Sequence, residues 1–226
     1  MKLSALARQG CALAALCLTA GAAWSAAGPD NAFLQYELQI QKGKRPAQKV
    51  VRKIWKKGDR YRVEIVTARG TEITIGGPKG GYVIAPGAKT ASHILEPLLT
   101  KQGLWVGIFG DTAAMRRTKK VGAETLLGRP TQIFEQKLNG MATGVAPGVK
   151  GTTRVWLAPD LPMPFKSIST MSPDMKSVAV LKSIDLSASI DDTLFELPKG
   201  VTVQADPMLK GMIPASKLPR RAWFRK

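Results

Sequence analysis

Side chains able to do acid–base, nucleophilic or metal chemistry are sparse in this sequence and do not cluster. His93 is the single histidine, which excludes a metal site built from several histidines. Asp191 and Asp192 are the only adjacent acidic pair, and we interpret them as a turn or a strand cap because carboxylate metal sites need larger clusters. His93 and Glu96 would lie one helical turn apart, a spacing more typical of a solvated face. No serine-centred nucleophile elbow is present, so we expect no catalytic residue, no metal and no cofactor.

The glycine-rich stretch Gly76–Gly81 could suggest phosphate binding. Its glycines and Lys79 lack the spacing of a loop that cradles a phosphate. We therefore interpret the stretch as the turn of a hairpin.

Binding of an apolar ligand has better candidates than catalysis. Apolar residues recur at helical spacing from Ser92 to Gly103, where Pro97 makes a helix short or kinked. The next stretch, Gly103–Gly110, is apolar, aromatic and bounded by glycines, which is typical of a buried strand or a mobile loop. The candidates for a cavity mouth are Leu95, Leu98, Leu99, Trp105, Ile108 and Phe109. The alternative is that these residues are ordinary core.

Basic residues suggest a second kind of contact, with anionic surfaces. The chain has 34 Lys and Arg against 16 Asp and Glu, a formal net charge of +18, which favours phospholipid head groups or lipopolysaccharide as partners. The candidates for this contact are Arg220, Arg221, Trp223, Phe224, Arg225 and Lys226; a solvated terminus is the alternative. Burying an acyl chain of ~15 methylenes gains roughly 12 kcal/mol, whereas one basic residue near such a surface gains about 1 kcal/mol. Charge would then recruit the ligand and a cavity would hold it.

The first segment has the character of a secretory signal. Lys2 and Arg8 precede the apolar stretch Cys11–Ala23, which is too short to span a bilayer, and small residues follow at 25–27. We expect residues 1–27 to be cleaved, residues 28–204 to form one domain, and residues 205–226 to form an irregular basic, aromatic tail. Both cysteines lie in the signal, and Cys17 follows Leu16, so we expect neither a disulfide nor lipidation. Export argues against nucleic acid as a partner, and we expect no membrane span after cleavage.

Alternating apolar and polar residues predict many short strands. They are expected at Phe33–Ile40, Gln48–Lys56, Arg60–Val66, Thr71–Ile75, Tyr82–Ala85, Thr131–Leu138, Thr152–Leu157, Phe165–Thr170 and Ser177–Leu186. Such strands at regular spacing favour an antiparallel meander. The pattern becomes helical at Ser92, and Phe195–Val201 is typical of a strand end or edge.

Four stretches in this order resemble the LolA/LolB-like superfamily of exported proteins. They are Lys53–Glu64 (KIWKKGDRYRVE), Val121–Glu135 (VGAETLLGRPTQIFE), Arg154–Ser167 (RVWLAPDLPMPFKS) and Asp191–Val203 (DDTLFELPKGVTV). The resemblance covers roughly residues 33–203. It implies a mainly β fold with some α, an antiparallel curved sheet forming an incomplete barrel, a short helical lid and an apolar cavity that receives acyl chains.

The resemblance also implies roles for particular residues. The stretch 154–170 would be a hairpin whose Trp156 fills the concave face or the core beneath it, and Trp55 joins the candidate ligand contacts. Lipoprotein carriers in this superfamily use an arginine near the cavity to hold the lid closed, for which Arg62 and Arg154 are candidates.

We therefore expect an exported, periplasmic, non-enzymatic protein that holds a lipid or the acyl chain of a lipoprotein. The alternative is an envelope interaction or sensor protein that uses the same fold to bind a protein or an anionic envelope polymer.

Overall fold

The computed structural model describes residues 29–77, 80–94, 109, 111–139, 150–171 and 174–204, and these residues form one sheet with two short helices. The strands are β1 (Asn31–Lys42), β2 (Gln48–Lys57), β3 (Arg60–Thr67), β4 (Gly70–Gly77), β5 (Gly80–Ile84), β6 (Thr90–Ile94), β7 (Lys119–Leu126), β8 (Arg129–Asn139), β9 (Lys150–Leu157), β10 (Pro164–Met171), β11 (Met175–Asp185) and β12 (Thr202–Gln204). The helices are α4 (Thr112–Arg116) and the 3-10 helix η3 (Asp192–Phe195). No helix in this described part of the chain has the length and apolar character needed to cross a membrane.

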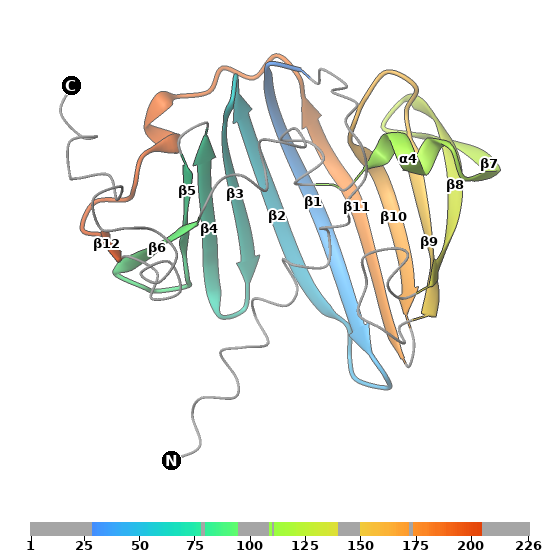
Figure 1. Ribbon diagram of the computed structural model, residues 1–226, viewed down its shortest axis with the longest axis horizontal. Coiled ribbons are helices and arrows are strands. Elements are labelled where there is room, and N and C mark those ends of the chain that lie inside the picture. Colours follow the sequence, from blue (N-terminus) through green and yellow to red (C-terminus); the bar gives the residue numbers. More distant parts are fainter. Residues whose placement is uncertain are drawn as a thin grey trace.

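All twelve strands belong to one curved sheet that does not close into a barrel (Figure 1). The order is β12-β6-β5-β4-β3-β2-β1-β11-β10-β9-β8-β7. Every pairing is antiparallel except that of β12 with β6, which is parallel. β1 therefore lies in the middle of the sheet, between β2 and β11, and the predicted fold class is confirmed.

The pairing register assigns each residue to one of two faces, because directly opposed residues of an antiparallel ladder point to the same side. One row across six strands is Phe134, Val155, Ser167, Ala179, Leu38 and Val50. The neighbouring row, on the other face, is Ile133, Trp156, Lys166, Val180, Glu37 and Val51. We call the first side the Tyr36 face, since Tyr36 lies two residues from Leu38 on β1, and the second side the Trp156 face.

The Tyr36 face carries the main core. Alternate β1 residues Ala32, Leu34 and Tyr36 are buried, and they pack with Ile54 of β2 and Val63 of β3. The loop between β9 and β10 adds further core side chains, namely Ala158, Leu161 and Met163. In Figure 1, α4 crosses in front of β8–β10, and its Met115 joins a smaller cluster with Phe134, Val155 and Leu157 on the same face.

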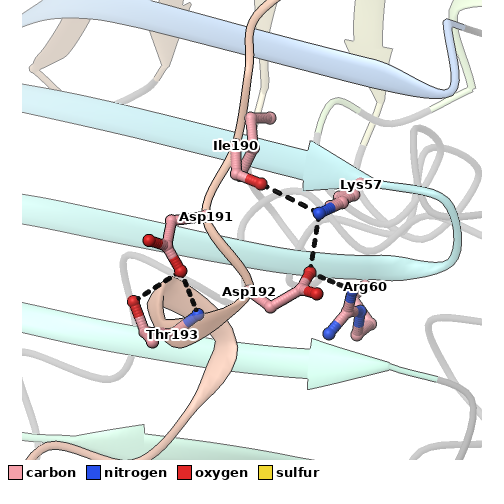
Figure 2. A network of polar contacts seen from close by, with 6 residues as sticks. All are labelled: Lys57, Arg60, Ile190, Asp191, Asp192 and Thr193. Atoms are coloured by element: carbon pink, nitrogen blue, oxygen red, sulfur yellow. Dashed lines mark hydrogen bonds and ion pairs between the residues drawn. The ribbon is translucent and has the colours of Figure 1, made fainter.

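The segment that follows β11 contacts the Trp156 face at the end of β2 and the start of β3. Figure 2 shows how this segment is held: Asp192 pairs with Lys57 at 2.7 Å and with Arg60 at 2.6 Å. Asp191 caps η3 by accepting a hydrogen bond from the backbone N–H of Thr193 at 2.8 Å. The sequence predicts a turn or a strand cap at this acidic pair; Asp191 instead caps a 3-10 helix.

Nine strands agree with the alternating pattern to within a few residues, and the hairpin at 154–170 is the β9–β10 pair. Pro164 is the first residue of β10, where a missing N–H is tolerated.

Two expectations about local structure are wrong. Ser92 does not begin a helix, because Ser92–Ile94 complete β6, which pairs with β5 on one side and with β12 on the other. The stretch Phe195–Val201 is not a strand: its first residue ends η3, and the edge strand begins only at Thr202. The predicted helix over residues 95–99 lies outside the described residues.

Candidate functional site

The centre of the Tyr36 face combines apolar side chains with two opposite charges. Tyr36 of β1, Arg52 of β2, Ile65 of β3 and Glu72 of β4 are consecutive partners in one row across the sheet. Strand spacing places the Cα atoms of Arg52 and Glu72, two strands apart, roughly 10 Å from each other. Phe109 lies over this row, with its ring centroid 5.5 Å from that of Tyr36.

Tyr36 is anchored at both ends of its side chain. Its ring packs against Phe109, and its hydroxyl donates a buried 2.7 Å hydrogen bond to the carbonyl oxygen of Pro164. Burial raises the pKa of Tyr36 well above its ordinary value, and the nearby charge of Arg52 opposes this only in part. Tyr36 therefore remains a neutral donor that fixes the start of β10.

Arg52 places a positive charge among these apolar groups. The central carbon of its guanidinium lies 5.8 Å from the centroid of the Phe109 ring. This distance is within the range in which a cation is attracted to an aromatic face. Glu72 is partly buried in the same row, and burial raises the pKa of its carboxyl. The row can therefore accept an apolar chain and present a cation to a polar or anionic head.

Towards β8–β11 the same face is lined by small and hydroxyl-bearing residues. Thr153 and Ser169 are hydrogen-bonded through their side-chain oxygens at 2.9 Å. Ser177 is the partner of Ser169, and Ser167 is the partner of Ala179. All five are only half-buried. Small side chains leave more room above a sheet than leucine or phenylalanine would, and they supply weak polar contacts.

α4 is fixed over one side of the face by polar contacts to the loop between β9 and β10. The hydroxyl of Thr112 donates to the carbonyl of Pro162 at 2.8 Å. Arg116 donates to the carbonyl oxygens of Ala158 at 2.5 Å and Leu161 at 2.8 Å. Burial lowers the pKa of Arg116, although the charge of Asp160 opposes the shift.

The candidate ligand contacts do not all come together. Phe109 lies on the Tyr36 face, whereas Trp55 and Trp156 lie on the opposite face. Trp156 donates from its indole N–H to Glu124 at 2.7 Å, and Lys166 lies 4.5 Å from its ring centroid. Trp156 is buried but does not fill the face that carries α4. Leu95, Leu98, Leu99, Trp105, Ile108 and the tail residues 220–226 lie outside the described residues.

Arg62 and Arg154 also lie on the Trp156 face. Arg62 pairs with Glu64 at 2.7 Å, and Arg154 pairs with Glu135 at 2.6 Å. The arginine on the Tyr36 face is Arg52, which sequence reasoning missed. Arg52 is two residues before the buried Ile54 on the same strand, so the two side chains point to the same face. This alternation could have predicted that Arg52 lies on the core side.

Within the described ranges, no three histidine, cysteine or acidic side chains are grouped so that they could hold a metal ion.

No family model matches the sequence, and no curated protein is similar to it in sequence. An uncharacterised conserved protein from Thermus thermophilus has a similar structure, with TM-score 0.52 and 9% identity over 78% of this chain and 91% of that chain. A LolA superfamily protein from Nitrosomonas europaea matches with TM-score 0.42 and 13% identity over 75% of this chain and 91% of that chain. The complex of MucA and MucB from Pseudomonas aeruginosa gives TM-score 0.43 and 12% identity over 76% of this chain and 57% of the matched one.

These matches concern the fold. The chain shares its overall fold with the Thermus thermophilus protein, and its own curved, mainly antiparallel sheet stays open, as the sequence predicts.

Proposed function

We propose that the Tyr36 face holds the acyl chain of a lipid or of a lipid-modified protein, and that the protein is a non-enzymatic binding protein. The observation that carries this proposal is a set of half-buried apolar residues on this face, which we call its floor. Leu38, Val50, Ile65 and Ala179 are apolar and only partly covered; Ile65 is the partner of Arg52, and Leu38 is the partner of Val50 and of Ala179.

The energetics favour an apolar ligand at this place. Each methylene removed from water is worth about 0.8 kcal/mol, so even half of a long acyl chain on this floor would gain several kcal/mol. Arg52 supplies a charge for a phosphate, carboxylate or ester oxygen at one end of the chain. The serine and threonine hydroxyls near β10 make the floor tolerant of a polar head group as well.

Filling the floor tests the proposal. In the Ala179→Trp variant, a large ring would occupy the space above β11, so we expect the amount of co-purifying acylated ligand to fall at least tenfold. Native mass spectrometry and lipid extraction of the purified protein measure this amount. Val180→Trp is the matched control, because Val180 is the next residue and lies on the Trp156 face.

Equal ligand content in both variants, with both folded, would contradict the proposal. A protein partner captured at a fixed ratio, without any lipid and lost only in Ala179→Trp, would instead support the alternative of an interaction or sensor protein.

The proposal includes export to the periplasm after removal of residues 1–27. Protein isolated from the cell envelope should therefore begin near residue 28, which N-terminal sequencing would show. Full-length protein confined to the cytoplasm would contradict this part alone.

A further inference from the structure

We propose that the end of the sheet formed by the β1–β2 hairpin is a docking surface for an anionic lipid bilayer. Five cations define this surface, which we call the basic hairpin end: Lys42, Lys44, Arg45, Lys49 and Lys176. All five are exposed.

The β1–β2 hairpin borders an open hollow whose charged lining residues are mainly basic. Lys42, Gly43, Lys44, Arg45, Pro46 and Asp174 line an open hollow of about 530 Å³. The backbone N–H of Gly43 donates to the carbonyl of Asp174 at 2.9 Å, which ties the hairpin to the chain entering β11. Asp174 contributes the one carboxylate among these six residues, against three cations. A phosphate head group entering the hollow would therefore meet a positive surplus.

Further cations continue the positive surface along the same end of the sheet. Lys176 lies opposite Gln41 of β1, and its row passes through β10 and β9 to Lys137 of β8. Lys150 begins β9 beside that row. Both Lys137 and Lys150 are exposed. The surface thus extends over six neighbouring strands, from β2 to β8, which suits a flat partner better than a narrow one.

Within the described part of the chain, the cations of the basic hairpin end form no salt bridge, although Asp174 lies in the same hollow and Glu37 is near Lys49. Among the described residues, salt bridges involve cations elsewhere, such as Lys182 with Glu37 at 3.7 Å and Lys166 with Glu124 at 3.8 Å. The basic hairpin end takes part in none of them. Its charge is therefore available to an external anion.

A bilayer fits these observations better than a nucleic acid does. The five residues include no aromatic side chain on which a base could stack, whereas lysine-rich clusters bind anionic lipid surfaces. Ile40 and Lys42 lie on the Tyr36 face, whereas Lys49 and Lys176, the partners of Gln39 and Gln41, lie on the Trp156 face, so the cations occupy both sides of this end of the sheet. The docking itself needs only the charges and does not depend on ligand binding by the Tyr36 face.

Two double variants of the full chain test the inference with the same loss of charge. Lys44→Gln with Arg45→Gln removes two cations of the basic hairpin end. Lys89→Gln with Lys199→Gln removes two exposed cations near β6 and β12; Lys89 precedes β6, which is four strands and roughly 19 Å from β2, well beyond the screening length in physiological salt. Sedimentation with vesicles containing phosphatidylglycerol, and with vesicles of phosphatidylcholine alone, measures the affinity.

We expect binding to the phosphatidylglycerol vesicles only. Each charge at such a surface is worth about fivefold in affinity, so the hairpin variant should bind about 25-fold more weakly, while the variant at Lys89 and Lys199 stays near the wild type. Equal losses in both variants, or no loss in either, would overturn the inference. A larger loss for a short DNA duplex than for vesicles would also overturn it and assign the surface to nucleic acid.

Discussion

Tyr36 connects three parts of the molecule through one side chain. It belongs to β1, its ring contacts Phe109, and its hydroxyl holds the first residue of β10. Arg52 beside it supplies the charge of the candidate site. The properties of the Tyr36 face therefore depend on the geometry of this pair.

Replacing Tyr36 with phenylalanine should lower the free energy of unfolding by about 1–2 kcal/mol at neutral pH, because the buried carbonyl of Pro164 loses its donor. Burial raises the pKa of Tyr36, so the folded protein keeps this proton when the unfolded chain, near pH 10, begins to lose it. The contribution of Tyr36 is thus complete below about pH 10 and is lost as the pH rises towards the folded pKa. Urea unfolding of both proteins at neutral and alkaline pH measures the difference.

Tyr82→Phe is the control for this variant, since Tyr82 is half-buried on the Trp156 face and contacts His93. We expect Tyr82→Phe to lower the free energy of unfolding by less than Tyr36→Phe does. A difference between wild type and Tyr36→Phe that grows above pH 10 would contradict the assignment.

Among the elements, the segment from η3 to β12 fastens the Trp156 face of β2–β6. η3 is held by the ion pairs of Asp192 and by a hydrogen bond from Arg62, which is itself ion-paired with Glu64 within β3. Arg62 and Glu64 have side chains 11% and 19% exposed, and Arg62 also donates to the carbonyl of Leu194 at 3.0 Å. Asp192, which pairs with Lys57 and Arg60, is 61% exposed. We expect the less exposed pair to contribute more to the stability of the fold.

Arg62→Met should destabilise the fold by about 2 kcal/mol, because it leaves Glu64 poorly solvated and without its partner. Asp192→Asn should change stability little, since water screens an exposed pair. Chemical denaturation gives both values, and hydrogen exchange at residues 192–204 would show whether the loss is local. A greater loss for Asp192→Asn would contradict this ranking.

For the whole molecule, the dominant electrostatic quantity is the net charge of +18. Like charges within one chain repel each other and oppose compaction, and salt screens this repulsion. The same screening weakens attraction to an anionic surface.

Adding sodium chloride should therefore raise the melting temperature while it reduces vesicle binding. Thermal unfolding and vesicle sedimentation across one salt series measure the two trends. A melting temperature that falls with salt would show that the attractive pairs, such as that of Asp192, outweigh the net repulsion.

Alternation with a period of two was sufficient to predict most of the sheet, because half-buried strands need apolar residues on one side only. Leu34 and Tyr36 identify the buried side of β1 without any knowledge of its neighbours. β7 escaped prediction because its residues are largely exposed at the sheet edge, and Val121 is 38% exposed. β6 was misread because its conformation is set by pairing with distant residues 202–204.

The sequence by itself determined the strand-rich composition, the positive charge and the turn chemistry, since these depend on neighbouring residues alone. Which side chains share a face was decided only by the tertiary structure, because the register and strand order join residues far apart in the chain. Trp156 and Phe109 therefore lie on opposite faces, while Arg52 lies beside Phe109 and Tyr36. The same pairing of distant strands brings Asp174 against the β1–β2 hairpin and gathers its cations at one end of the sheet.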